Sequence, residues 1–315
     1  MLDNPIFSFD QTVSNNLKAL SDSQSRDEER RICELFAVAA SAAELSEVLI
    51  GEGMDIYSVL AVISEGLSVT KPHVHGDALA CNRERLLAFD ALLSVTDRVF
   101  LASLYLEKMR ATVSLTEGDF LPSSHAGGRI VYVKNAYSDE AYDVFSAEIS
   151  NPRVGYADSL KEAVRAVSAD AAQYCLLPLE ERGARIASVE ELLFLNELRI
   201  ASVTPVFGYD GAADMKYALV SKHYRIPRIL KGDEKYLEIM LPSEGDFRLD
   251  ELLLAASILG NSLYRVKSST FRTADGVREY YTAVLKGGTD FTSLLVYLTL
   301  FAPSATVMGI YKNIE

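Results

Sequence analysis

The residues best placed for chemistry form a short charged run after an apolar segment. Glu180 and Glu181 directly follow the apolar segment Gln173–Leu179, and Arg182 and Arg185 come next. Adjacent carboxylates could act as an acid/base pair, but neighbouring residues after a strand usually point apart, so a solvated loop is the simpler interpretation. The arginines could bind a carboxylate ligand or could pair with the glutamates, and the sequence leaves both open.

A second candidate is a metal site in the first third of the chain. His73 and His75 form an HxH pattern beside Asp77 and Cys81. Catalytic zinc requires three protein ligands of defined geometry, and no later partner follows this pair. We therefore expect a surface loop here, and predict no metal and no cofactor. Cys175 lies within the apolar segment, where a cysteine usually acts as a small buried hydrophobe and not as a nucleophile.

Alternating strands and helices are predicted to position the charged run. The predicted strands are Arg129–Val133, Arg153–Gly155, Gln173–Leu179, Arg199–Val206 and Lys216–Ser221, and the predicted helices are Ser138–Ser150, Ser159–Val167 and Ser188–Asn196, the first capped by Ser138. This alternation favours a mostly parallel sheet that is covered on both faces.

Ligands of such sheets bind beyond the carboxyl ends of the strands. Two of these ends carry polar residues, Lys134–Ser138 and Pro178–Arg185. We predict that Tyr137, Ser138, Glu180 and Arg182 contact any ligand of this part of the chain.

The last stretch, Lys235 to Glu315, predicts a strand-helix-strand-strand-helix-strand unit. Its predicted strands are Tyr236–Leu241, Leu263–Val266, Tyr280–Leu285 and Thr306–Ile310, and its predicted helices are Leu249–Leu259 and Asp290–Leu300. A ferredoxin-like unit of this kind usually binds small molecules or partners.

The first hundred residues predict helices, namely Arg26–Leu49, Met54–Gly66 and Cys81–Met109, with Ser21 or Ser23 as the cap of the first. The segment Leu121–Gly128 predicts a linker. We therefore predict three domains, at residues 1–125, 126–225 and 226–315.

Composition sets outer limits on function. The 315 residues carry a formal net charge of -13, which argues against partners that reward a basic patch, so we expect neither nucleic acid nor membrane. The N-terminus MLDNPIFSFD lacks the pattern of a signal peptide, and three widely separated cysteines suggest no disulfide framework. A cytoplasmic location is the natural expectation.

The two polar loops resemble those of the prephenate dehydratase family. Tyr137–Ser138 matches the end of the family's glycine-rich turn, and the run from Leu177 to Arg182 aligns with its Val-Pro-Ile-Glu-Asn-Ser motif. The strand from Met215 aligns with the family's Thr-Arg-Phe motif, so the resemblance adds Lys216 to the predicted ligand contacts. It implies one lobe of a periplasmic-binding-like α/β fold, followed by an α+β ferredoxin-like (ACT) domain, with a small carboxylate or aromatic ligand.

The departures from the family motif point away from catalysis. Met215 stands where the family has its threonine proton donor, and a thioether supplies no proton. Lys216 replaces an arginine and loses its planar fork. Only one lobe is predicted, and Phe247 stands where the family's phenylalanine site has a glycine. We therefore predict no catalytic residue and a degenerate member that serves in sensing or partner binding.

The alternative is an active enzyme on prephenate or chorismate. The family often carries a helical chorismate mutase domain, and Arg98 and Lys108 lie about three turns apart on the predicted helix Cys81–Met109. The other mutase motifs do not follow at the family's spacing.

We also expect a homodimer through the ACT-like domain, because its two helices offer more apolar surface than one small sheet face buries. The long apolar helix Cys81–Met109 is the competing surface.

Overall fold

The structure is a computed structural model, and it describes residues 5–67, 93–111, 113–121, 123–124, 127–207, 213–228, 234–245, 247–273, 276–287 and 290–313. Among these residues, the strands form one sheet in the order β2-β1-β3-β6-β5-β10-β7-β9-β8, with β4 paired to β3. The strands are β1 (Arg129–Tyr132), β2 (Arg153–Tyr156), β3 (Tyr174–Glu181), β4 (Ala184–Arg185), β5 (Arg199–Phe207), β6 (Ala213–Ser221), β7 (Lys235–Pro242), β8 (Ser262–Thr273), β9 (Gly276–Gly287) and β10 (Thr306–Lys312).

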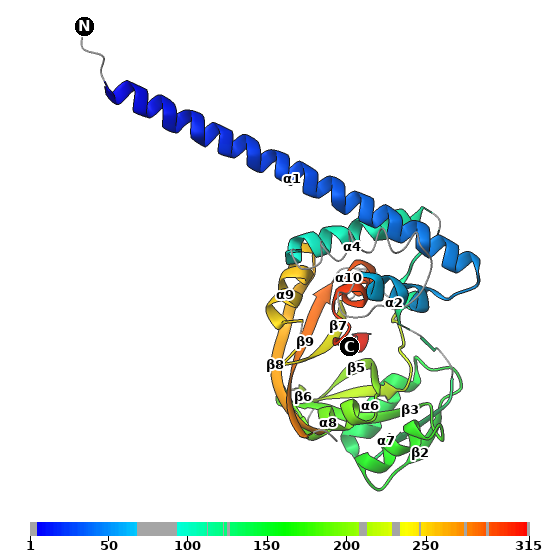
Figure 1. Cartoon of the computed structure of the whole chain (residues 1–315). Helices are drawn as coiled ribbons and strands as arrows, with labels where there is room; N and C mark the ends of the chain where they lie inside the picture. The colour runs from blue at the N-terminus through cyan, green and yellow to red at the C-terminus, as the bar shows by residue number, and fades with distance from the viewer. Residues whose placement is uncertain are drawn as a thin grey trace.

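Helices cover this sheet and extend beyond it. They are α1 (Pro5–Gly51), α2 (Ile56–Leu67), α4 (Val95–Arg110), α5 (Glu117–Phe120), α6 (Ala136–Ser146), α7 (Leu160–Ser168), α8 (Ala187–Leu195), α9 (Leu249–Ile258) and α10 (Thr292–Phe301). Figure 1 shows α1 crossing the top of the molecule, with its N-terminal half projecting away from the body.

The sheet is mixed, so the prediction of a mostly parallel sheet is wrong in one respect. β1 pairs in parallel with both β2 and β3, but β6 runs antiparallel between β3 and β5. Only five residues (208–212) separate β5 from β6. A connection this short joins antiparallel neighbours, whereas parallel strands need a crossover of a dozen residues or more.

The terminal unit contains all six predicted elements in the predicted order. Its strands β10, β7, β9 and β8 lie side by side, and every pairing among them is antiparallel. β8 and β9 are longer than predicted because their hairpin pairs from Ser262 to Thr273, with one register shift between Leu263 and Arg265. Among the described residues, β8 and β2 are the two edge strands of the sheet.

The terminal unit and the preceding strands share one continuous sheet. β10 pairs in parallel with β5 through Gly309 and Ile200. A Cβ built on Gly309 would lie 2.5 Å from the carbonyl oxygen of Ile200. The junction between the two parts of the sheet therefore requires glycine at this position.

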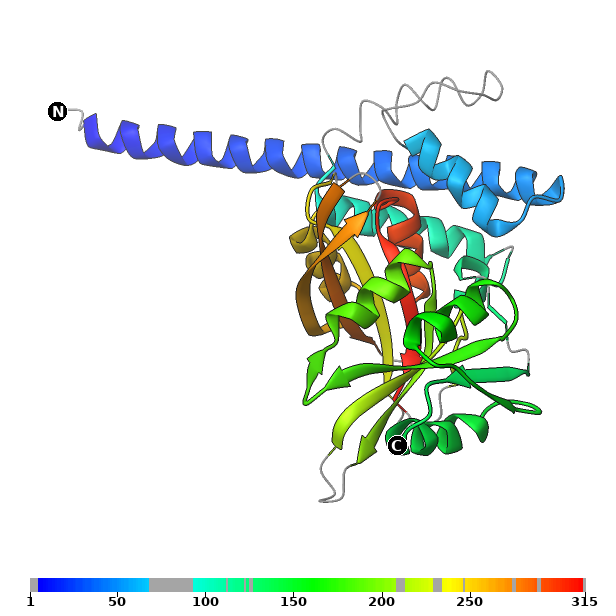
Figure 2. The same ribbon diagram turned by 90° about the horizontal axis from the view of Figure 1, so that it is seen from below.

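The curved sheet separates three apolar cores, and Figure 2 shows its curvature from below. One face of the terminal unit packs against α9 and α10, which α1, α2 and α4 cover in turn. The opposite face, which we call the concave face, encloses a core with α7 and α8. The third core lies under α6.

Two helix starts and one helix length differ from the sequence predictions. α1 already begins at Pro5, so Ser21 and Ser23 lie inside the helix and do not cap it. α6 is capped by Asn135, with Ser138 in its first turn. The described part of the long helix predicted from Cys81 begins only at Val95, after the capping box of Ser94 and Asp97.

No helix in the described ranges combines the length and apolarity needed to cross a membrane. His73, His75, Asp77 and Cys81 lie outside the described residues.

Candidate functional site: a buried charged cluster on the concave face

A β-bulge turns Glu180 toward the concave face. Pro178 pairs with Tyr217 and Glu180 pairs with Lys216, so Leu179 is the extra residue. A bulge of this kind bends the strand and re-aims its side chains. Glu180 and Lys216 consequently lie on the side of the sheet that faces the terminal unit.

Glu180 is buried and is held by three cations. Arg265 Nη1 donates to Glu180 Oε1 at 2.7 Å, and Arg185 Nε lies 3.2 Å from the same oxygen. Lys216 Nζ lies 3.7 Å from Glu180 Oε2. Because these cations occupy its oxygens, Glu180 is poorly placed to act as a general base.

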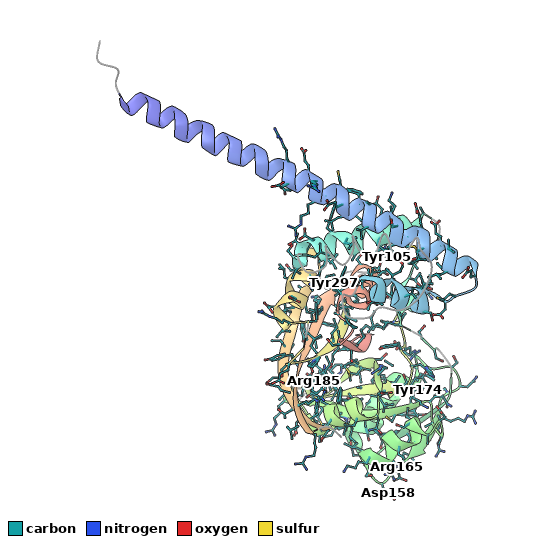
Figure 3. All side chains as sticks on the ribbon, in the orientation of Figure 1. Tyr105, Asp158, Arg165, Tyr174, Arg185 and Tyr297 are labelled. Carbon is teal, nitrogen blue, oxygen red and sulfur yellow. The ribbon has the colours of Figure 1, made fainter. Side chains whose placement is uncertain are left out.

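Arg185 joins the two parts of the sheet. Its Nη2 donates to Glu238 Oε2 of β7 at 2.5 Å and to the hydroxyl of Tyr311 of β10 at 3.3 Å. The Tyr311 hydroxyl in turn donates to Glu238 Oε2 at 2.8 Å. The Arg185 side chain is only 4% exposed, and Figure 3 shows it between the strands.

Burial and neighbouring charges shift the pKa values of Tyr311 and Arg185 in the charged cluster, which consists of Glu180, Arg185, Lys216, Glu238, Arg265 and Tyr311. Burial, with Glu238 next in effect, raises the pKa of Tyr311 well above its usual value, so this phenol stays protonated. The pKa of Arg185 is also raised, because the attraction of Glu238, Tyr311 and Glu180 outweighs the cost of its burial. At neutral pH Tyr311 is therefore neutral and Arg185 is charged.

The cluster has one positive charge in excess. Its three cations are Arg185, Lys216 and Arg265, and its two carboxylates are Glu180 and Glu238. Arg185 Nη1 is buried and has no hydrogen-bond partner among the described residues. The cavity at the cluster is partly open and measures about 10 Å³, which is about the room that one water molecule needs.

The accessible part of the cluster is its rim. Arg265 and Lys216 have side chains that are each 27% exposed. Tyr264 is 48% exposed, and the guanidinium of Arg265 lies 5.8 Å from the centre of its ring. Two cations beside an exposed aromatic ring can hold a carboxylate that carries an aromatic group.

The predicted site residues do not all gather here. Glu180 and Lys216 lie together, whereas Arg182 occupies the turn between β3 and β4 with a φ of 47° and is exposed. Ser138 is buried, and its Oγ donates to the carbonyl of Val133 at 2.8 Å within the cap of α6. Tyr137 is packed against the core beneath α6, on the opposite side of the sheet from Glu180.

The question that the sequence left open for Arg185 is answered, because Arg185 pairs with Glu180. The sequence analysis missed Glu238, Arg265 and Tyr311. A glutamate inside the apolar strand KYLEIML was the one available signal, since a buried charge needs a partner. Nothing in the sequence indicated that its partner would come from the β3–β4 hairpin.

The other residues raised by the resemblance lie elsewhere. Met215 is packed against the core under α6, and Phe247 is buried with its ring 6.0 Å from that of Tyr297. Arg98 faces Glu251 of α9 at 3.9 Å, and Lys108 is exposed.

No protein-family model matches the chain, and the search of curated proteins gives no match. Among solved structures, a prephenate dehydratase from Streptococcus mutans aligns over 59% of this chain and 99% of its own, with a TM-score of 0.46 and 13% identity.

Two further solved structures align over 58% of this chain, each with a TM-score of 0.43. GqqA, described as a novel type of quorum quenching acylase, is 16% identical over 94% of its length. A prephenate dehydratase from Arthrobacter aurescens in complex with L-Phe is 14% identical over 89% of its length. At these scores and identities the similarities assign neither an activity nor a ligand to this chain.

Proposed function

We propose that this protein is a non-catalytic binding protein for a small aromatic carboxylate, a degenerate relative of prephenate dehydratase that serves in sensing. The observation that carries the proposal is the rim of the charged cluster, where Arg265 and Lys216 stand partly exposed above one uncompensated positive charge. A carboxylate at this rim would neutralise that charge, and its aromatic group would lie against Tyr264. The aromatic group would remain outside the cavity, which is too small to hold it.

Sensing is supported by the position of the cluster. It contains side chains from β3, β4, β6, β7, β8 and β10, so a ligand at the rim contacts groups that hold both parts of the sheet together. Binding at such a site stabilises the folded chain by mass action. The proposal keeps the division into residues 1–125, 126–225 and 226–315, with 226–315 as the ACT-like unit.

The absence of catalysis is supported by the groups at the site. Met215 supplies no proton, and Glu180 is engaged by cations. Among the described residues of the cluster there is no serine or cysteine to serve as a nucleophile.

A thermal-shift screen tests the proposal. Phenylpyruvate, prephenate, chorismate and phenylalanine are added to the protein and to an Arg265→Gln variant, with Arg248→Gln as a matched control on an exposed ion pair. At least one acid should raise the melting temperature of the wild type and of the control but not of Arg265→Gln. Equal shifts in all three proteins would contradict the proposed site, and formation of phenylpyruvate from prephenate above the uncatalysed rate would favour the alternative of an active enzyme.

A further inference from the structure

A second cavity lies away from the charged cluster, between the helices and the starts of β5 and β10. It measures about 480 Å³, within the range of roughly 300–1,000 Å³ that is typical of small-molecule sites. Its lining comes from α2, α5, α10, the loop before β10 and the segment around Tyr224. Figure 1 shows α2 and α10 side by side above β5 and β7.

The surface of this cavity is about equally polar and apolar, and the apolar residues form one continuous side of it. Phe120, Leu295 and Leu298 are buried core residues that border it, and Ala302 and Val307 complete this side. A ligand with a hydrocarbon body would remove apolar surface from water on both itself and these walls. The apolar side of the cavity thus favours a ligand with a hydrocarbon body.

The hydroxyl groups of the lining already donate to backbone carbonyls. Ser64 Oγ donates to the carbonyl of Leu300 at 3.0 Å, and Thr299 Oγ1 donates to that of Leu295 at 2.8 Å. The hydroxyl of Tyr224 donates to the carbonyl of Val307 at 2.9 Å. These groups therefore offer no hydroxyl hydrogen to a ligand unless they give up an existing bond.

Among the described lining residues, Arg199 is the cation, and its guanidinium makes no hydrogen bond of this kind to a carbonyl. It is half-buried at the start of β5, and its guanidinium lies 5.3 Å from the centre of the Tyr224 ring. No carboxylate in the described part of the chain lies within ion-pair distance of it. This guanidinium lies against an aromatic ring and borders the cavity, so its planar N–H groups can bind a carboxylate with two hydrogen bonds.

We propose that this cavity binds a monocarboxylate with a hydrocarbon body, with the carboxylate on Arg199 and the body between α2 and α10. The ligand class follows from a cation that has no carboxylate partner among the described residues, next to the apolar side of a cavity of this size. This site is separate from the rim of the charged cluster, and its test does not depend on the proposed function.

Decanoate is a suitable probe, because it has one carboxylate on an unbranched hydrocarbon chain. Titration calorimetry compares decanoate with decan-1-ol, which has the same body without the charge, and with acetate, which has the charge without the body. The wild type should bind decanoate at least about tenfold more tightly than either control, as expected for a charge-assisted hydrogen bond combined with apolar burial.

Two variants locate the binding. Arg199→Gln removes the charge at similar length and should weaken decanoate binding about tenfold or more, with little effect on decan-1-ol. Ala61→Trp adds bulk from the exposed side of α2 and should weaken both ligands. Arg265→Gln, at the other site, should bind decanoate as the wild type does.

Three results would overturn the proposal: absence of decanoate binding to the wild type, unchanged binding in Arg199→Gln, or loss of binding in Arg265→Gln. Circular dichroism of each variant establishes that a loss of binding does not come from unfolding. If Arg199→Gln fails to fold, Ala61→Trp, which lies at an exposed helix position, still decides whether this cavity is the site.

Discussion

Removing Arg185 should destabilise the fold strongly, because this side chain neutralises carboxylates on two parts of the sheet. In Arg185→Leu, Glu180 would keep Arg265 at 2.7 Å and Lys216 at 3.7 Å. Glu238 would keep only the hydroxyl of Tyr311 among the partners described here. Removing one member of a buried ion pair typically costs about 3–5 kcal/mol, since it leaves a charge that is neither hydrated nor paired.

Urea denaturation of the wild type, Arg185→Leu and Arg182→Ala measures this cost. Arg182→Ala is the matched control, because Arg182 lies three residues away in the same hairpin but is exposed. We expect the control to stay within about 0.5 kcal/mol of the wild type, as is usual for surface substitutions. Equal free energies of unfolding for Arg185→Leu and Arg182→Ala would refute the claim that the ion pairs of Arg185 stabilise the fold.

The double variant Arg185→Leu with Glu238→Leu separates the loss of a contact from the cost of an unpaired charge. If the orphaned carboxylate causes most of the destabilisation, the double variant should be more stable than Arg185→Leu by about 1 kcal/mol or more. A double variant whose loss equals the sum of the two single losses would show that the two side chains do not interact energetically.

Three further predictions follow from other parts of the structure. Gly309→Ala should lower the free energy of unfolding, measured by urea denaturation, by about 1–3 kcal/mol, because the added Cβ would clash with the carbonyl of Ile200. Gly245→Ala should change it little, since a Cβ there meets no atom closer than 3.6 Å. Burial raises the pKa of Tyr297 to about 12, so the stability that this group contributes is complete below pH 10 and is lost as the pH rises toward 12. Tyr297→Phe should reduce this loss of stability at alkaline pH and should change stability little at pH 7, because the Tyr297 hydroxyl has no hydrogen-bond partner among the described residues. A steeper alkaline loss in the variant than in the wild type would contradict this prediction. If the protein is a homodimer through β8, an edge strand of the sheet, Leu263→Glu should shift light scattering toward the monomer, because Leu263 is 46% exposed there, and an unchanged dimer would exclude this edge.

The structure excludes one of the two helices that the sequence suggested as a dimer surface, namely α10. Leu294, Leu295 and Leu298 of α10 are buried under the helices of the first part of the chain, so they are not available to a second subunit. Leu254 and Ile258 of α9 remain exposed beside β8. Apolar residues on a helix can be covered within the same chain, and periodicity alone does not tell which neighbour covers them.

The sequence predicted elements better than it predicted contacts. Between residues 129 and 312 every predicted strand and helix has a counterpart, because apolar periodicity and turn residues are local properties. The two-residue strand β4 and the bulge at Leu179 were not predictable in this way, although together they decide where Glu180 and Arg185 lie. The contact between Arg185 and Glu238 joins residues 53 positions apart, and only the folded sheet brings them together.

The measurement that tests the central claim most directly is a calorimetric titration of phenylpyruvate into the wild type, Arg265→Gln and Lys216→Gln. The account predicts saturable binding to the wild type that weakens with added salt, because the rim is partly exposed to solvent. It also predicts about tenfold or greater loss of affinity in Arg265→Gln, with a smaller loss in Lys216→Gln. Wild-type affinity in Arg265→Gln, or no binding by the wild type, would contradict the claim that this rim is a carboxylate site.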